Sequence, residues 1–298
     1  MKNILFRADS SSKIGIGHIM RDLVLAKKYS KKGAKIVFAT QNLKGNINQK
    51  IIDAGFNVEI LKSNSKKELV KLVKKLNVKL LVIDHYKISY KKERYIKENT
   101  GVKILSFDDT YERHHCDILL NHNIGADEKR YKNLIPKNCE LRCGSKYTLI
   151  RDEFYQELKK RYEKNKKFTF FVAMGGADTA NLNIKILKSL KEFKNIKVNL
   201  VTTTANKNIE RLQRYSLDKK WINLHINSNK LAKLMRKSDL AIISPSVILN
   251  EVHFMKLPFI AIKIAKNQKY IYEYLRKENF LVIKKFNKLV KVLKIWMK

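Results

Sequence analysis

Short apolar runs alternate with longer amphipathic segments along the whole chain. Each run is a few residues long and almost continuously hydrophobic, which is typical of parallel strands covered on both faces. Strands are predicted at Asn3–Phe6, Lys35–Ala39, Val58–Leu61, Leu80–Ile83, Val102–Ser106, Ile118–Leu120, Phe168–Met174, Lys197–Val201, Ile222–His225, Leu240–Ile243, Phe259–Ile262 and Phe280–Ile283.

The segments between these strands repeat apolar residues at helical spacing. The clearest are Asp22–Lys32, Lys66–Leu76, Asn181–Glu192 and Lys230–Lys237, and a charged helix is predicted at Asp152–Lys167. Strands that alternate with helices predict an α/β fold with parallel sheets.

The series occurs twice, and each copy opens with a strand, a glycine-containing turn and a helix. We therefore predict a GT-B-like arrangement of two Rossmann-like domains, residues 1–148 and 149–298, with the joint near Lys146–Arg151. Their parallel sheets are expected to face each other across a cleft. Ligands of open α/β sheets bind at the carboxyl ends of the strands.

The first of these turns holds a candidate for acid–base chemistry. Gly15 and Gly17 follow the first predicted strand, and His18 stands beside the start of a helix expected from about Ile19. Glycine lets the backbone approach a ligand closely and adopt positive φ. A histidine at this position is a candidate acid or base.

Polar turns follow successive strands of the second half. Gly175-Gly176 is a candidate phosphate cradle, because backbone N–H groups at a helix N-terminus bind anions. Ser246 is a candidate helix cap, and Glu251 suits either ribose hydroxyls or the helix dipole. We interpret these turns as one nucleotide-binding face, which also includes Thr202–Thr204, Asn250 and Asn267.

Polar residues also end two strands of the first half. Asp84-His85-Tyr86 and Asp108-Asp109 occupy equivalent strand ends, where clustering leaves a functional role and simple capping equally open. His114-His115 is expected on a surface loop. Because no Asp-x-Asp motif occurs, we predict no metal ion at the diphosphate.

The three cysteines are Cys116, Cys139 and Cys143. An odd count without a secretory signal argues against a disulfide framework. We expect ordinary, partly buried thiols. Zinc binding is the less favoured alternative, because structural zinc sites usually pair closer cysteines.

The net charge is +37, from 64 basic and 27 acidic residues, but the lysines are spread along the whole chain. This distribution predicts solvated lysine faces and no specific nucleic-acid site. The basic stretch Lys285–Lys298 is expected to be a helix packed on the fold, with weak contact to an anionic membrane as the alternative. Without a signal peptide or a membrane-spanning stretch, we expect a cytoplasmic monomer.

Several runs together resemble one family, the UDP-sugar hydrolases of pseudaminic acid biosynthesis (PseG), whose fold is similar to that of the MurG-type glycosyltransferases. The resemblance extends from Asn3 to about Gln268. The runs are Asp9-Ser-Ser-Ser12, Ile14-Gly-Ile-Gly-His18, Arg21-Asp22, Ile83-Asp-His-Tyr86, Ile104-Leu-Ser-Phe-Asp-Asp109, His114-His-Cys-Asp-Ile-Leu-Leu-Asn121 and Met174-Gly-Gly176.

The resemblance implies hydrolysis of UDP-2,4-diacetamido-2,4,6-trideoxy-beta-L-altropyranose to UDP and the free sugar, without a cofactor. It implies that His18 is the catalytic base and that Tyr86 lies beside the sugar. It places Asn250 and Glu251 on the nucleotide and Arg151 near the interdomain cleft.

UDP is a good leaving group, so the reaction needs a positioned water more than a protein acid. We expect neutral His18 to take a proton from this water, with inversion at the anomeric carbon. Asp9 or another nearby carboxylate is expected to orient His18. Helix N-termini near Gly175-Gly176 and Ser246 are expected to stabilise the diphosphate. The predicted substrate contacts also include Gly15 and Gly17.

Two other functions remain open from the sequence. A GT-B glycosyltransferase would use the same nucleotide face and transfer the sugar to a hydroxyl acceptor. A basic nucleic-acid-binding or surface-binding protein would explain the charge, although the ordered turns at the strand ends speak against it.

Overall fold

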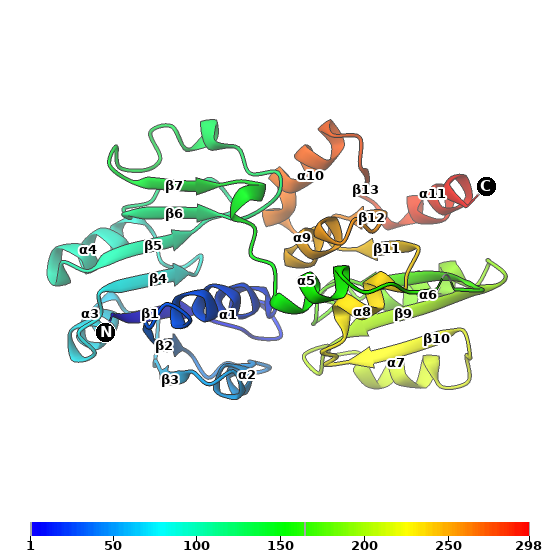
Figure 1. Ribbon diagram of the computed structural model, residues 1–298, viewed down its shortest axis with the longest axis horizontal. Coiled ribbons are helices and arrows are strands. Elements are labelled where there is room, and N and C mark those ends of the chain that lie inside the picture. Colours follow the sequence, from blue (N-terminus) through cyan, green and yellow to red (C-terminus); the bar gives the residue numbers. More distant parts are fainter. Residues whose placement is uncertain (1, 164, 298) are drawn as a thin grey trace. The chain divides into compact units, whose positions relative to one another are not determined.

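The structure is a computed structural model that describes residues 2–163 and 165–297. The chain divides into two compact units, Met1–Leu149 (unit 1) and Ile150–Lys298 (unit 2). Each unit contains one sheet, and the paired strands run parallel (Figure 1). The predicted α/β fold is confirmed. No helix among the described residues is long and apolar enough to cross a membrane.

Unit 1 is built on a seven-stranded sheet in the order β3-β2-β1-β4-β5-β6-β7. Strands β2 and β3 lie on one side of β1, and β4 to β7 follow on its other side, so β1 and β4 are parallel neighbours at the centre of the sheet. The strands are β1 (Asn3–Ala8), β2 (Lys35–Thr40), β3 (Asn57–Ile60), β4 (Leu80–Asp84), β5 (Lys103–Phe107), β6 (Ile118–Asn121) and β7 (Glu140–Cys143).

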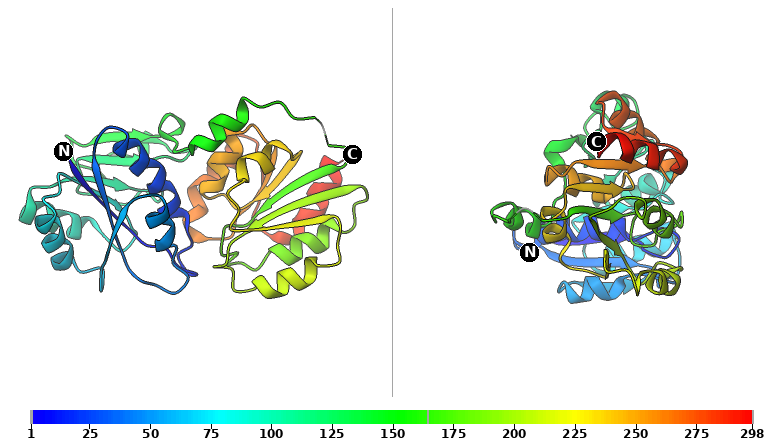
Figure 2. Two further views of the ribbon diagram at one scale, coloured as in Figure 1. Left: turned by 60° about the horizontal axis from the view of Figure 1, so that its bottom comes forward. Right: turned by 90° about the vertical axis from the view of Figure 1, so that its right-hand side faces the viewer.

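Alternate residues of β1 enter different cores, as the period of a strand requires. Ile4 and Phe6 pack with Ile19, and Leu5 packs on the opposite face with Leu69. Helices therefore lie on both sides of this sheet (Figure 2). They are α1 (Gly17–Ser30), α2 (Asn48–Asp53), α3 (Lys66–Lys75) and α4 (Tyr90–Thr100), with 3₁₀ turns η1 (Glu128–Tyr131) and η2 (Ser145–Tyr147).

Unit 2 has a six-stranded sheet in the order β10-β9-β8-β11-β12-β13. The strands are β8 (Phe168–Ala173), β9 (Ile196–Thr202), β10 (Ile222–Ile226), β11 (Leu240–Ile243), β12 (Phe259–Ile262) and β13 (Leu281–Ile283). The helices are α5 (Asp152–Leu158), α6 (Asn183–Leu190), α7 (Ile209–Ser216), α8 (Leu231–Arg236), α9 (Val247–Phe254), α10 (Lys269–Lys277) and α11 (Leu289–Trp296), with 3₁₀ turns η3 (Lys266–Gln268) and η4 (Phe286–Lys288).

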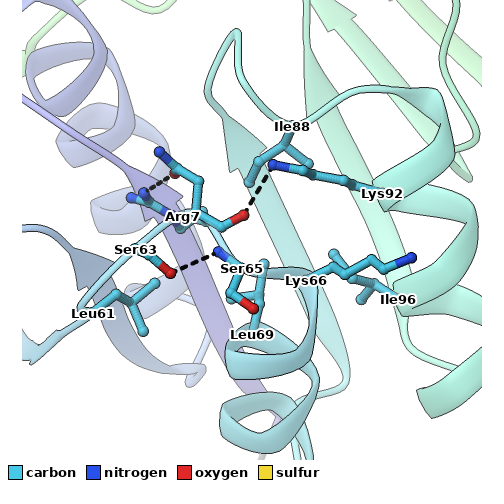
Figure 3. Close-up of a pocket in the computed structure, with 10 residues that line it drawn as sticks. Arg7, Leu61, Ser63, Ser65, Lys66, Leu69, Ile88, Lys92 and Ile96 are labelled. Atoms are coloured by element: carbon cyan, nitrogen blue, oxygen red, sulfur yellow. Dashed lines mark hydrogen bonds between the residues drawn. The ribbon is translucent and has the colours of Figure 1, made fainter.

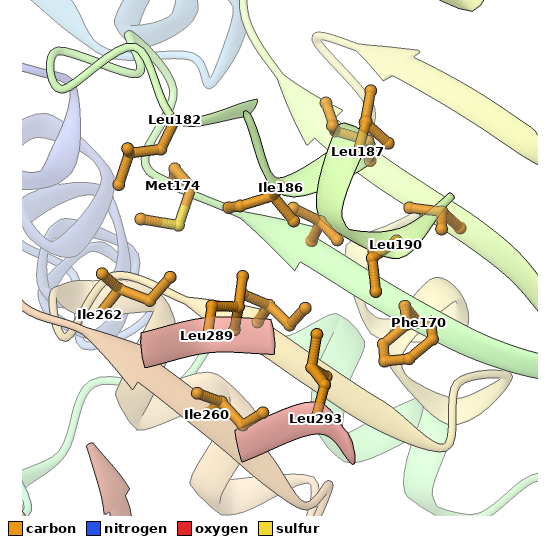
Figure 4. Close-up of a cluster of buried hydrophobic side chains, with 14 of the residues drawn as sticks. Phe170, Met174, Leu182, Ile186, Leu187, Leu190, Ile260, Ile262, Leu289 and Leu293 are labelled. Carbon is orange, nitrogen blue, oxygen red and sulfur yellow. The ribbon is translucent and has the colours of Figure 1, made fainter. Parts of the chain in front are cut away.

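The C-terminal helix α11 belongs to the core of unit 2. Leu289 and Leu293 are fully buried and lie in one cluster with Phe170 and Ile186 (Figure 4). The prediction that this basic stretch packs on the fold is confirmed. Lys298, at its end, lies outside the described residues.

Two elements differ from the sequence prediction. Strand β7 was not predicted, because Glu140 and Arg142 interrupt its apolar pattern and pair with each other at 2.8 Å on an exposed sheet edge. The charged helix predicted at Asp152–Lys167 is wrong beyond Leu158. There Glu157 accepts a hydrogen bond from the Tyr162 hydroxyl at 2.6 Å, and the described residues between Leu158 and β8 form no helix.

Candidate active site

The chain between β1 and α1 forms a compact turn that leads into His18. Ser11 and Gly15 form an antiparallel bridge, and the Ser11 hydroxyl accepts a hydrogen bond from the Ile14 amide at 2.9 Å. Gly15 has φ +86°, a conformation that residues with side chains rarely adopt. Gly17 is the first residue of α1. The predicted glycine turn is therefore present.

His18 is the second residue of α1, and its side chain is 12% exposed. Its Nδ1 lies 3.9 Å from Oδ1 of Asp84, which is too far for a hydrogen bond, and no described residue hydrogen-bonds to this nitrogen. The Tyr86 ring meets the imidazole edge to face, with centroids 5.1 Å apart. The structure thus brings together two of the predicted site residues, His18 and Tyr86.

Burial lowers the pKa of His18 below its usual value of 6.5. The carboxylates of Asp84 and Asp109 oppose this lowering, and the charge of Arg21 adds to it. The neutral imidazole therefore predominates at neutral pH, and only this form can accept a proton. The electrostatics of unit 1 suit a general base at His18.

Arg21 links the carboxylates around His18. Its Nε and Nη2 each lie 2.5 Å from an oxygen of Asp84, and its Nη1 lies 3.3 Å from Oδ2 of Asp109. Asp109 also accepts a hydrogen bond from the Tyr86 hydroxyl at 2.8 Å. Burial alone would lower the pKa of Arg21, but Asp84 outweighs it and the pKa lies well above its usual value. This network fixes the position of Asp84 beside His18.

Sequence reasoning assigned no role to two buried groups of this cluster. Asp22 is fully buried, and no described residue hydrogen-bonds to either carboxyl oxygen. Burial, with the charge of Asp84, raises the pKa of Asp22 well above its usual value. His122 lies 3.5 Å from Arg21, and burial lowers its pKa to about 3. Burial therefore favours the uncharged forms of Asp22 and His122. No local sequence pattern indicates that these two side chains are buried.

Of the carboxylates predicted to orient His18, Asp9 or another nearby one, Asp9 is bound elsewhere. Its carboxylate accepts hydrogen bonds from Arg7 at 2.7 and 2.8 Å and from the Gln41 amide at 2.7 Å. It also lies 3.0 Å from Nε2 of His85. Through these contacts the Asp9 carboxylate links the end of β1 to the residue after β2 and to the turn after β4. The carboxylate beside His18 is Asp84.

His114 is buried, so the expectation of a surface loop is wrong for this residue. Its Nδ1 lies 2.8 Å from Oε1 of Glu93, and its Nε2 lies 4.0 Å from Asp108. Burial opposes protonation, but the two carboxylates raise the pKa of His114 to about 10. The imidazolium therefore lies between the carboxylates of Glu93 and Asp108, beside the Asp108-Asp109 turn. His115 is half-buried beside it.

In unit 2, Gly175 has φ +82° and turns the chain after β8. Helix α6 begins only at Asn183, and its first amides are already bound: Asp178 accepts hydrogen bonds from the amides of Leu182 at 2.9 Å and Asn183 at 3.0 Å. Asp178 therefore caps the start of α6, and the use of this helix N-terminus for a phosphate stays a prediction. The amides of the Gly175-Gly176 turn itself stay a predicted contact.

The turn after β9 holds the glycine turn in place. The hydroxyls of Thr202 and Thr203 each donate a hydrogen bond to the Gly176 carbonyl oxygen at 3.0 Å. Further along, Asn267 is exposed within η3, and the neighbouring Gln268 side chain accepts a hydrogen bond from the Ile264 amide at 2.8 Å. Hydrogen bonds within unit 2 thus hold these turns at the ends of the strands in place.

Helix α9 carries the other predicted residues of unit 2. Ser246 stands at its N-cap, but its hydroxyl caps no amide and lies 3.3 Å from the Ser244 hydroxyl. Asn250 and Glu251 are buried. Glu251 accepts a hydrogen bond from Nε of Arg151 at 2.8 Å. Burial raises the pKa of Glu251, although Arg151 opposes it.

A separate pocket in unit 1 lies between α3, α4 and the loop after β3, and contains none of the predicted site residues (Figure 3). Its cationic side chains already have partners. Lys92 donates to the carbonyl oxygens of Asn64 and Lys87 at 3.0 Å, and Arg7 binds Asp9. This pocket is part of the framework around the end of β1. Among the described residues, no three His, Cys, Asp or Glu side chains are grouped to hold a metal ion.

The chain is 45% identical over 283 residues to the UDP-2,4-diacetamido-2,4,6-trideoxy-beta-L-altropyranose hydrolase of Campylobacter jejuni, covering 95% of this chain and 99% of that protein. Its fold is similar to MurG from Acinetobacter baumannii, with a TM-score of 0.65, 13% identity and coverage of 100% and 91%. It is also similar to HepE from Anabaena in complex with UDP-glucose, with a TM-score of 0.61, 10% identity and coverage of 100% and 90%. At these identities the two structures establish the GT-B fold alone. No protein-family model matches the chain.

Proposed function

Because the chain belongs to the family of UDP-2,4-diacetamido-2,4,6-trideoxy-beta-L-altropyranose hydrolases, we propose that it hydrolyses this UDP-sugar. The products are UDP and 2,4-diacetamido-2,4,6-trideoxy-L-altrose, a step of pseudaminic acid biosynthesis. The observation that carries the proposal within the structure is the placement of His18 at the start of α1, with the Asp84 carboxylate 3.9 Å from its Nδ1 and the Tyr86 ring against the imidazole.

His18 acts as the base. Its buried Nδ1 faces the Asp84 carboxylate, which favours the tautomer with the proton on Nδ1. The lone pair of Nε2 is then available to a water molecule. As this water attacks the anomeric carbon, its proton passes to Nε2 and the bond to UDP breaks on the opposite side. The Asp84 carboxylate stabilises the imidazolium that forms.

Tyr86 has a different role. Its side chain is half exposed at 53%, its ring contacts His18 and its hydroxyl is bound to Asp109. An aromatic ring held in this way suits the apolar face of a sugar with acetamido and methyl groups. We assign Tyr86 to substrate positioning, with Gly15 and Gly17 allowing close approach of the backbone.

Unit 2 binds the UDP. The buried Glu251 is the ribose ligand in this proposal, and Arg151 fixes its orientation by the 2.8 Å hydrogen bond. With α6 capped by Asp178, the diphosphate is assigned to the N-terminus of α9, where the Ser244 and Ser246 hydroxyls lie together. Asn250, Asn267 and the amides of Gly175-Gly176 complete the assigned contacts.

We also propose that the protein acts as a monomer. The UDP-sugar is a charged intracellular metabolite, and we therefore place the reaction in the cytoplasm. The positive net charge of +37 attracts the doubly charged UDP-sugar at low salt.

Incubation with the UDP-sugar in the absence of any acceptor tests the proposal. Proton and phosphorus NMR should show UDP and free sugar in equal amounts, with the first-formed sugar inverted at the anomeric carbon. A UDP-sugar that remains intact until a hydroxyl acceptor is added would overturn the hydrolase in favour of a glycosyltransferase. The His18→Asn variant serves as the control for contaminating activities.

A further inference from the structure

Two of the three free cysteines are in contact at the edge of unit 1. The Sγ atoms of Cys116 and Cys139 lie 3.7 Å apart. The two residues precede the neighbouring parallel strands β6 and β7, where the Glu140 amide donates a hydrogen bond to the Asp117 carbonyl oxygen at 2.9 Å. The backbone therefore holds the two thiols side by side.

The two thiols differ in reactivity. The hydrogen bond between the two thiols lowers the pKa of Cys139, and the charged His114 acts in the same direction against burial. The same hydrogen bond, with burial, raises the pKa of Cys116. Cys139 is half-buried whereas Cys116 is buried. The reactive thiolate therefore forms at Cys139, the thiol that a small oxidant can reach.

We propose that Cys116 and Cys139 form a reversible disulfide when a peroxide oxidises Cys139. The Cys139 thiolate attacks the peroxide oxygen, the O–O bond breaks, and Cys139 becomes a sulfenic acid. The Cys116 sulfur then attacks the Cys139 sulfur. Its proton leaves with the displaced hydroxyl as water. In total, two thiols lose two electrons and hydrogen peroxide is reduced to two waters.

The surroundings of the pair favour this bond over further oxidation. The sulfurs need to approach from 3.7 Å to the roughly 2 Å of a disulfide, a shift within reach of side-chain rotation. Cys143, at the other end of β7, has no thiol neighbour among the described residues, and burial raises its pKa to about 12. The pair lies at the amino ends of β6 and β7, away from the carboxyl ends of β1 and β4 that precede His18 and Tyr86.

Treatment of the reduced, full-length protein with hydrogen peroxide tests the proposal. Peptide mass spectrometry without reductant should show a cross-link between the Cys116 and Cys139 peptides, and dithiothreitol should reverse it. The free-thiol count should fall from three to one. Cys139 should react at least about tenfold faster than Cys143, because its thiolate fraction is larger.

Single serine variants separate the roles of the thiols. Cys143→Ser should keep the cross-link. Cys116→Ser should instead accumulate sulfinic acid at Cys139, because no second thiol traps the sulfenic acid. A wild-type protein that accumulates sulfinic acid at Cys139 without a cross-link, or that cross-links through Cys143, would overturn the proposal.

Discussion

The carboxyl edges of the two sheets use opposite kinds of polar chemistry. The edge in unit 1 is a cluster of buried ionisable groups, in which Arg21 and Asp84 are only 4% and 2% exposed. The turns in unit 2 are built mainly from hydroxyls, amides and glycines, and Asp178 is committed to capping α6. Unit 2 also contains an ion pair, between Arg151 and the buried Glu251.

This difference separates the two halves of the reaction. Buried charges shift the pKa of their neighbours, so unit 1 can keep His18 neutral and ready to accept a proton. The hydroxyls and amides of the unit 2 turns, together with the Glu251 carboxylate that Arg151 binds, can hold a nucleotide by hydrogen bonds. We infer that unit 1 governs the chemical step and that unit 2 governs affinity for UDP.

The largest effect is expected from His18→Asn. Removal of the base should lower kcat by roughly 10²–10⁴-fold. The UDP dissociation constant, measured by calorimetry, should stay unchanged because unit 2 is intact. Near-normal turnover would contradict the assignment of the base. A loss of UDP binding in the same variant would contradict the claim that unit 2 alone governs affinity for UDP.

Asp84→Asn should come next, because it removes the carboxylate that binds Arg21 through two hydrogen bonds and leaves this buried charge only the longer contact with Asp109. Loss of one partner of a buried pair typically costs about 3–5 kcal/mol in the free energy of unfolding. Chemical denaturation measures this loss. The exposed pair Arg94–Glu98 supplies the control, since Glu98→Gln should leave the unfolding midpoint unchanged. Equal stabilities of the two variants would show that the unit 1 cluster is not energetically distinct.

Glu251→Gln tests unit 2. Loss of the charged acceptor should weaken UDP binding by roughly 10- to 100-fold, the range for a hydrogen bond to a charged group. The value of kcat should change little. Glu153, which also binds Arg151 at 2.8 Å but is 39% exposed, is the matched control. If Glu251→Gln and Glu153→Gln both leave the UDP dissociation constant unchanged, Glu251 is not the ribose ligand.

The smallest effect is expected from Asp22→Asn. The folded-state pKa of Asp22 is raised, so the folded protein retains a proton that the unfolded chain releases above about pH 4. The wild type therefore loses stability as pH rises above that value. The variant should be more stable than the wild type at pH 7, by more than the roughly 0.5 kcal/mol of a surface change.

The control for Asp22→Asn is Asp53→Asn, on the exposed surface of α2. Denaturation at pH 4 and pH 7 should show a pH-dependent gain for the first variant and none for the second. If Asp22→Asn is no more stable than the wild type at pH 7, Asp22 has a charged partner in the folded state.

The fold was readable from the sequence because its signal is local. Strands such as Leu240–Ile243 and Phe259–Ile262 have the predicted boundaries, since continuous apolar runs reflect burial on both faces. Strand β7 was missed because an edge strand exposes Glu140 and Arg142. A local pattern cannot show which strands lie at the edge of a sheet.

The candidate site was only partly readable, because its decisive contacts join distant positions. The turn with Gly15 and His18 follows from adjacent residues. The pairing of Arg21 with Asp84 depends on the neighbouring positions of β1 and β4 in the sheet. The sequence could not identify Asp84 as the carboxylate beside His18, because Asp9 is excluded only by its contact with Arg7. The Asp178 cap required the actual start of α6.

The pH dependence of kcat/KM for hydrolysis of the UDP-sugar tests the central claim most directly. If His18 is a neutral base with a lowered pKa, kcat/KM should stay constant down to below pH 6.5 and then fall as the imidazole becomes protonated. The residual activity of His18→Asn should lack this acidic limb. An acidic limb at or above pH 6.5, or one that persists in the variant, would contradict the account.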